Sequence, residues 1–352
     1  MKIVKMHIEN NASFHFGDTN GHLNETFSSD RLFSALTNNI RLMYGTERIA
    51  DFVSLVEGNK LGFSSACFGL EFLPKGESLE KRVIYFLPRP KIDIYFSNDT
   101  YRSYKEFKKI EYVSINLFKR FSASWNREKD AVIIVPEDVR IVSKKFALLK
   151  EELAGISIEV NEWEFLSFMT HHVQPGVEVN RLNSKSENYF TREDIVIRYQ
   201  ETKNYVIKPF FYFYVNGEIP DYVRAAIRLL ADEGVGGRRS SGRGFFQNVE
   251  LVDSPHHFPD DGPMLMTLST YFPKRDEVDT LYSYELEKRN GYIYSRYGTS
   301  LRKKSILTIR EGSLLKDEVE GQILDIKPVR FPDHPVYFYG KPLLVGFGGD
   351  SR

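Results

Sequence analysis

The stretch DYVRAAIRLLADEGVGGRRSSGRGFFQNVELV, residues 221–252, contains the most unusual composition in this sequence. Residues 234–246 hold five glycines, three arginines and two serines, and no acidic residue. Glycine adopts positive φ readily and lets another molecule approach the backbone N–H groups, which in a run form an anion-binding concavity. Arginine adds a planar fork of donors that suits phosphate. Residues 234–244 therefore predict a site for a phosphodiester backbone.

The residues on either side distinguish this segment from a nucleotide-binding loop. Asp221 to Glu233 has apolar residues at helical spacing, which predicts a helix that ends at Gly234. Residues 245–252 predict a strand, so the order is helix, glycine loop, strand. A P-loop has the opposite order because it holds phosphate at a helix N-terminus, and this segment also lacks the Lys and Ser/Thr of the Walker A pattern. The alternative on composition alone is a solvated surface loop.

The whole chain restricts where a nucleic-acid site can lie. Its 352 residues predict about two domains. Lys plus Arg and Asp plus Glu number 48 each, so the net charge is zero and any such site must be a local patch. The single cysteine, Cys67, excludes an intramolecular disulfide and a cysteine-based zinc site. No apolar stretch is long enough for a signal peptide or a membrane span, so we expect a soluble, cytoplasmic protein without membrane contact.

Both halves of the chain begin with strand, helix, strand. In the first half, residues 1–8 predict a strand and Ser29–Tyr44 a helix with one apolar stripe, capped by Ser28 or Ser29. This order opens a split β-α-β unit. We therefore expect an α+β fold of two ferredoxin-like domains, residues 1–203 and 204–352. Further strands are expected at 61–73, 82–87, 206–215, 265–272, 305–310 and 335–347, and a helix at 276–288.

Residues 176–200 predict a long β-hairpin, because apolar residues alternate on both arms. Its middle, residues 180–192, is polar and carries Arg181, Lys185 and Arg192 against Glu187. Leu182, Tyr189 and Phe190 are suited to insert between splayed bases, since sequence-specific RNA recognition mostly targets single strands. The hairpin is therefore a second candidate contact for RNA.

The sequence resembles the RAMP superfamily of CRISPR proteins. Within it, the sequence is most similar to the subunit of the type III-A (Csm) effector complex that holds the 5′ handle of the CRISPR RNA. Four stretches carry the resemblance: His15-Phe16-Gly17 with Thr26 to Leu36 (TFSSDRLFSAL), Asn180-Arg181-Leu182-Asn183, the glycine loop, and Arg310 to Ser313 with Tyr337 to Pro342. They extend over most of the chain, while residues 88–165 add little.

The resemblance implies two ferredoxin-like (RRM-like) domains with a projecting thumb hairpin. It implies a scaffold subunit without a catalytic centre, cofactor or metal. Its partners would be the handle of the CRISPR RNA, the large nuclease and cyclase subunit, and RAMP backbone subunits. The expected RNA-binding residues are His15, Phe16, Ser29, Arg31, Asn180, Arg181, Leu182, Asn183, Lys185, Gly234, Gly236, Gly237, Arg238, Arg239, Ser240, Ser241, Gly242 and Arg243. Replacing Arg238 and Arg239 together with alanine is expected to lower guide-RNA retention.

Two alternatives remain at this point. One is a metal-independent endoribonuclease of the same superfamily, in which His15 and His22 supply acid–base chemistry. The other is the equivalent handle-binding subunit of a different CRISPR effector type. The basic run Arg302-Lys303-Lys304 is interpreted as a solvated face or as a contact to RNA or a neighbouring subunit. Asp30 is interpreted as an N-terminal helix carboxylate rather than as a general base.

Overall fold

The computed structural model describes residues 1–17, 23–77, 79–96, 105, 107–126, 131–156, 158, 162–163, 166–258, 262–293, 301–331 and 333–349. The helices and 3-10 turns are α1 (Ser29–Tyr44), α2 (Glu47–Glu57), α4 (Ile115–Ser124), α6 (Asp221–Arg228), α7 (Leu230–Glu233), η1 (Pro136–Asp138), η2 (Lys150–Leu153), η3 (Arg239–Ser241) and η4 (Arg275–Thr280). Two of the three expected helices, at 29–44 and 221–233, are confirmed, the second with a break at Leu229. None of the described helices is long and apolar enough to cross a membrane.

The largest sheet has the strand order β10-β11-β7-β5-β4-β15-β1-β16, and β3 and β14 pair with β15. Its strands are β1 (Lys2–His7), β3 (Leu61–Phe63), β4 (Cys67–Pro74), β5 (Arg82–Pro88), β7 (Tyr112–Ser114), β10 (Val139–Val142), β11 (Phe146–Leu149), β14 (Gln200–Glu201), β15 (Tyr205–Gly217) and β16 (Asn248–Asp253). A separate small sheet contains β6 (Asp93–Phe96), β8 (Trp125–Asn126) and β9 (Ala131–Ile134).

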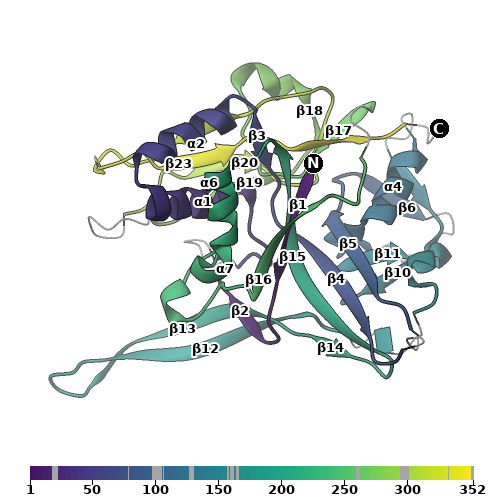
Figure 1. Ribbon diagram of the computed structural model, residues 1–352, viewed down its shortest axis with the longest axis horizontal. Helices are drawn as coiled ribbons and strands as arrows, with labels where there is room; N and C mark the ends of the chain where they lie inside the picture. The colour runs from purple at the N-terminus through teal and green to yellow at the C-terminus, as the bar shows by residue number, and fades with distance from the viewer. Residues whose placement is uncertain are drawn as a thin grey trace.

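Strand β15 lies at the centre of the molecule because both of its faces are buried. Phe211, Phe213 and Val215 belong to one hydrophobic cluster, which includes residues of α1, α2 and α6. Phe210, Tyr212 and Tyr214 belong to a second cluster, which includes residues of α4. Successive strand residues point to opposite faces, so a continuous apolar run fits a strand between two layers. Figure 1 shows α1, α2 and α6 on one side of this sheet and α4 on the other.

The expected division of the chain between residues 203 and 204 does not separate two sheets. β14, which ends at Glu201, pairs with β15, and β15 lies between β1 and β4. β16 pairs with the other edge of β1. The second half of the chain therefore completes the sheet that the first half begins. Strand partners far apart in the chain leave no signal in the local pattern from which the boundary was drawn.

Residues 262–293, 301–331 and 333–349 form smaller sheets. These are β18-β21-β17-β24, β19-β20 and β22-β23. The strands are β17 (Met264–Thr267), β18 (Leu281–Ser283), β19 (Leu286–Arg289), β20 (Ile306–Ile309), β21 (Leu314–Leu315), β22 (Gln322–Asp325), β23 (Tyr337–Gly340) and β24 (Leu344–Phe347). The expected helix at 276–288 is wrong: a single 3-10 turn leads into β18 and β19. Pairing of β19 with β20, more than a dozen residues away, overrides the local preference.

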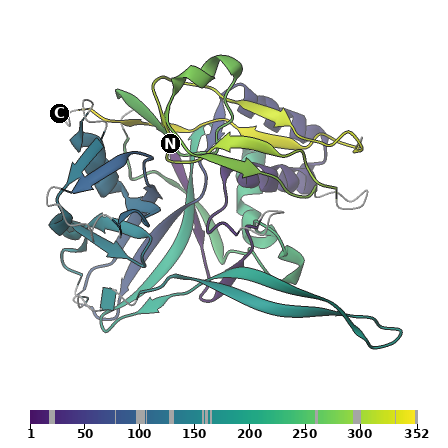
Figure 2. The ribbon, with the colours of Figure 1, turned by 180° about the vertical axis from the view of Figure 1, so that it is seen from behind.

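The expected hairpin is present and longer than expected. β12 (Met169–Val179) pairs with β13 (Ser186–Ile197), and β13 also pairs with β2 (Ala12–Phe14). Tyr189, Phe190 and Arg192 lie on its second strand. Figures 1 and 2 show that the far end of the hairpin extends away from the rest of the molecule. Most residues of β12 are exposed on both faces, so its first residues lack the alternation that marks a half-buried strand.

Candidate nucleic-acid interface

A cleft of about 1040 Å³ opens beside the first turns of α1. Its walls come from segments far apart in the sequence: the residues after β2, the exposed side of α1, the glycine loop, and residues 287–293 and 333–337. Helix α1 and the glycine loop, both of which the sequence analysis singled out, thus line one cleft. The C-terminal segments close its remaining side.

The cleft is positively charged, although the net charge of the chain is zero. Its lining has twice as many cationic side chains as carboxylates, and these are Arg31, Arg41, Arg239, Lys288, Arg289 and Lys303 against Asp30, Glu287 and Asp333. Such a concave, locally cationic surface attracts a polyanion and raises its local concentration. The local patch that a neutral chain would need for nucleic-acid binding is therefore present.

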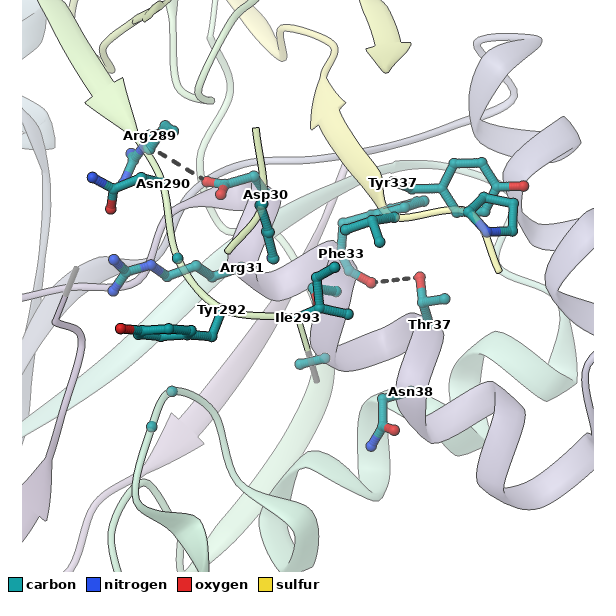
Figure 3. Close-up of a pocket in the computed structure, with 18 of the residues that line it drawn as sticks. Asp30, Arg31, Phe33, Thr37, Asn38, Arg289, Asn290, Tyr292, Ile293 and Tyr337 are labelled. Carbon is teal, nitrogen blue, oxygen red and sulfur yellow. Dashed lines mark hydrogen bonds and ion pairs between the residues drawn. The ribbon is translucent and has the colours of Figure 1, made fainter. Parts of the chain in front are cut away.

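The first turn of α1 is fixed by buried polar contacts. Asp30, whose side chain is 14% exposed, pairs with Arg289 at 3.9 Å, and Figure 3 shows this pair with Arg31 beside it. The Ser28 hydroxyl hydrogen-bonds the Asp30 carboxylate and does not cap the helix backbone, contrary to expectation. Asp30 thus contacts a cation from the C-terminal part of the chain, which local sequence did not indicate.

Burial and charge act in opposite directions on these groups. Burial raises the pKa of the Asp30 carboxyl, but Arg289 and Arg31 outweigh this effect and leave that pKa below its usual value. Burial also lowers the pKa of the Lys303 ammonium, and Asp30 only partly opposes it. Asp30 and Glu287, which pairs with Arg289 at 3.2 Å, therefore compensate this density of buried positive charge.

Replacing Asp30 with asparagine is expected to lower the free energy of unfolding by about 2 kcal/mol at neutral pH, because Arg289 loses one of its buried partners. The folded pKa of Asp30 lies below its unfolded value, so its contribution is full at a pH above that unfolded value. It is lost as the pH falls through the folded pKa.

Urea unfolding of the full chain at several pH values measures the difference in stability between Asp30→Asn and wild type, which should shrink in acid. Asp51→Asn, at an exposed pair on α2, is the control and should change stability by less than about 1 kcal/mol. Equal stability of Asp30→Asn and wild type at neutral pH would contradict the prediction.

The glycine loop takes backbone conformations that residues other than glycine rarely adopt. At Gly236, φ is +95°, and an added Cβ would lie 2.8 Å from the His15 carbonyl oxygen. At Gly244, φ is +84°, and an added Cβ would lie 2.2 Å from the Val235 carbonyl oxygen. These glycines thus let the loop backbone pack closely against other parts of the same chain. Gly236 packs against the segment after β2, and Gly244 packs against Val235 within the loop.

Several amides of the loop are already hydrogen-bonded within the chain. The N–H groups of Gly237 and Gly244 donate to the carbonyls of His15 and Ser13, each at 2.9 Å. Those of Val235, Ser241 and Gly242 donate to other carbonyls of the loop. These N–H groups fix the shape of the loop. They are therefore not the donors of the expected anion-binding concavity.

The three loop arginines have different positions. Arg239 lines the cleft and also donates to the Glu233 carbonyl at 3.1 Å. Arg239 also pairs with the Glu233 carboxylate at 3.7 Å, whereas Arg238 and Arg243 form ion pairs with Asp194 of β13, at 3.2 and 2.8 Å. Only one of the three expected phosphate ligands is therefore part of the cleft wall.

Some of the other expected RNA-binding residues line the cleft, and others are buried or lie outside it. His15, Arg31, Gly234, Gly236 and Gly237 line the cleft with Arg239. Phe16 and Ser29 are fully buried, so their expected contact with RNA is corrected: Phe16 stacks on Phe14, and the Ser29 hydroxyl accepts from the Thr270 N–H. Ser240, Ser241 and Gly242 are exposed on η3 outside the cleft lining.

His15 is held in a defined orientation. Its Nδ1 lies 2.8 Å from the Glu193 carbonyl oxygen and 3.5 Å from Asp194 Oδ1. Burial lowers the pKa of this imidazole, and Arg238 lowers it further, while the Glu193 carbonyl opposes both. A neutral ring that donates from Nδ1 presents Nε2 as an acceptor. The second expected histidine, His22, lies outside the described residues.

The expected hairpin residues gather at the tip, separate from the cleft lining. Leu182 is 98% exposed, and Asn180 and Asn183 accept backbone N–H groups two residues further on, which orders the turn. Arg181 and Lys185 are exposed on the same turn. Among the described residues, no group of His, Cys, Asp or Glu side chains forms a metal site.

Sequence reasoning missed the cleft residues that the C-terminal part contributes, among them Arg289 and Tyr292. Lys303 came from a basic run that had been noted as a candidate contact. Asp194 was missed because a single carboxylate on a predicted strand has no distinguishing local pattern. Its signal was its position among basic neighbours on the hairpin.

The fold of the chain is similar to that of subunits solved in CRISPR interference complexes. One chain of the Csm3-Csm4 subcomplex in the type III-A CRISPR-Cas interference complex matches with a TM-score of 0.66 and 23% identity, over 99% of this chain and 100% of its own. One chain of the Csm1-Csm4 cassette in complex with cA4 matches with a TM-score of 0.55 and 18% identity, over 98% and 97% of the two chains. At these identities, the likeness establishes the fold.

The sequence comparisons are more specific. Residues 260–347 match the model of the CRISPR Csm4 C-terminal domain. The CRISPR system Cms protein Csm4 of Methanocaldococcus jannaschii is 26% identical over 99% of this chain and 98% of its own length. Its counterpart from Thermococcus onnurineus is 25% identical over 90% of each chain. The chain is thus similar to Csm4 proteins over nearly its whole length.

Proposed function

We propose that this chain is a non-catalytic RNA-binding scaffold subunit of a type III-A CRISPR interference complex, which anchors the 5′ handle of the CRISPR RNA. The observation that carries the proposal is the cationic cleft between α1, the glycine loop and residues 287–293. Similarity to Csm4 proteins supplies the biological setting. A neutral protein that concentrates its positive charge in one concave site is suited to a polyanionic ligand.

The strand order supports a ferredoxin-like unit in this scaffold. In chain order β1, α1, β4, β15, α6 and β16 alternate as β-α-β-β-α-β, and in space the strands lie as β4-β15-β1-β16. This is the split β-α-β arrangement with two helices on one face. It differs from the expected division because the unit takes strands from both halves of the chain. The family model of the C-terminal domain begins at residue 260, which supports a second unit starting there.

We propose two contacts for the RNA. The cleft, through Arg31, Arg239 and His15, would hold the backbone and one base edge of the handle. The β12–β13 hairpin would act as the thumb, with the fully exposed Leu182 and the 72% exposed Tyr189 inserting between bases. The ordered turn at Asn180 favours this role because little conformational entropy is lost when it binds.

The partners follow from the related structures. Those structures contain Csm4 with Csm3, a RAMP backbone subunit, and Csm4 with Csm1, the large subunit. We propose equivalent neighbours for this chain. The alternative of an endoribonuclease would rest on His15, whose Nδ1 is engaged by the Glu193 carbonyl and whose ring forms one wall of the binding cleft.

The test is to purify a tagged full-length chain from its native cell and to identify the RNA and proteins that accompany it. Short RNAs that share one repeat-derived 5′ end, together with a large multidomain subunit, are the expected result. Recovery of the chain alone, or with precursor RNA trimmed at one position in EDTA, would overturn the scaffold proposal. His15→Ala would then be the variant that tests for a nuclease.

A further inference from the structure

Asp194 joins two parts of the molecule that the proposed function treats separately. It lies on hairpin strand β13, is 3% exposed, and accepts Arg238 Nη1 at 3.2 Å on one oxygen and Arg243 Nε at 2.8 Å on the other. Each arginine comes from the glycine loop, on either side of η3. One buried carboxylate of the hairpin therefore holds both ends of the exposed tip of the loop.

The rest of the loop is fastened nearby by its backbone. Gly237 and Gly244 donate to the carbonyls of His15 and Ser13, in the segment that includes β2, and β2 pairs with β13. Arg238 takes a left-handed conformation with φ of 59°. A residue other than glycine keeps this conformation only where its surroundings determine it. Here the ion pair with Asp194 holds the side chain, and the Arg238 carbonyl accepts hydrogen bonds from Ser241 and from the Arg243 N–H.

We propose that Asp194 is a positioning residue, which fixes the tip of the glycine loop against the hairpin and so sets the loop's place in the wall of the RNA cleft. This inference rests on the proposed function of the cleft. Arg238 and Arg243 act through Asp194 and are not phosphate ligands, in contrast to what their composition predicts. Direct contact with RNA from the loop falls to Arg239, which lines the cleft.

The sign of the effect separates this proposal from simple electrostatics. Removing a carboxylate near a cationic cleft should strengthen RNA binding if charge alone matters, because the local potential becomes more positive. If Asp194 positions the loop, the same change should weaken binding. The weakening should not alter the dependence on salt, because Arg239 still reaches phosphate in the complex and the loss is the cost of ordering the freed loop on binding.

The experiment compares full-length wild type, Asp194→Asn, Arg243→Ala and the double variant. The probe is a fluorescein-labelled single-stranded RNA of about 12 nucleotides, a span that one binding groove covers. Each single variant is expected to bind about 10-fold more weakly with an unchanged salt slope, because binding must then also order the freed loop. The double variant should be no weaker than Asp194→Asn, which already breaks the pair with Arg243. Arg243→Lys should recover part of the affinity.

Glu178→Gln is the matched control. It removes the same charge from the other hairpin strand, where Glu178 contacts Asn188 and not the loop. It should bind at least as tightly as wild type. Binding by Asp194→Asn that equals or exceeds that of wild type would overturn the proposal. So would an Arg243→Ala variant that lowers the salt slope by about 0.7 and whose effect adds to that of Asp194→Asn.

Hydrogen exchange of the amides at 235–244 separates this inference from the proposed function. These amides should exchange faster in Asp194→Asn than in Glu178→Gln, while exchange in β15 should match wild type in both. Unchanged exchange of the loop in Asp194→Asn would overturn the positioning role even if RNA binding is confirmed. Failure of wild type to bind RNA would instead overturn the proposed function, and the exchange rates would still decide whether Asp194 fixes the loop.

Discussion

Replacing Arg31 and Arg239 together with alanine is expected to weaken the binding of single-stranded RNA by at least roughly 100-fold. Both side chains line the cleft, from α1 and from the glycine loop. A hydrogen bond to a charged group contributes about 1.5–3 kcal/mol, and each 1.4 kcal/mol is tenfold in affinity. The log–log salt slope should become less steep by about 1.4, because each single-strand phosphate contact contributes about 0.7. Fluorescence anisotropy over a range of salt concentrations measures both quantities.

Arg82→Ala with Arg120→Ala is the control pair for this prediction. These arginines are 43% and 50% exposed, and neither lines the cleft. The control removes the same total charge, so it separates a local contact from the general field of the protein. Equal losses of affinity in the two double variants would contradict an RNA site in the cleft.

Gly236→Ala is expected to weaken RNA binding by roughly 30-fold. The new Cβ would lie 2.8 Å from the His15 carbonyl oxygen and 2.9 Å from the Phe16 ring, at a φ of +95°. Overpacking of this kind costs about 1–3 kcal/mol, in addition to the cost of the left-handed backbone. The loop should relieve the clash by moving away from His15, which displaces Arg239 from the cleft wall. RNA affinity and the amide exchange of the loop are the measurements.

Gly242→Ala is the matched control in the same loop. Its φ is +79°, but an added Cβ meets nothing within 4 Å. It should therefore share the backbone cost and lack the clash, and should bind RNA within about threefold of wild type. Equal losses of RNA affinity in the two variants would contradict the prediction. They would show that binding depends on the backbone conformation of the loop and not on its contact with His15.

Much of the local structure was readable from the sequence. The apolar stripe predicted α1 with its observed bounds, and the glycine after Glu233 predicted where α7 ends. Local periodicity succeeds here because each helix buries one face on the central sheet. The same reasoning failed at 276–288, where pairing with strands distant in the chain determines the conformation.

Only part of the candidate site could be predicted from the sequence. Composition and the resemblance identified the α1 start, the glycine loop and the hairpin tip. They assigned Phe16 and Ser29 to the surface, although both are fully buried. They also treated the three loop arginines as equivalent, because composition contains no information about partners. Asp194 lies more than 40 residues from Arg238, and their contact exists only when the hairpin folds against the loop.

The sequence by itself determined α1, the helix at 221–233, the left-handed glycine loop, the hairpin, and the requirement that a neutral chain concentrate its charge locally. These properties follow from the spacing of apolar residues and from the backbone freedom of glycine, which act over a few residues. Only the tertiary structure decided that α1, the loop and residues 287–293 form one cationic cleft. It also decided that β15 completes the sheet begun by β1, and that two arginines pair with Asp194. These features join residues far apart in the chain, so they depend on packing that no local pattern specifies.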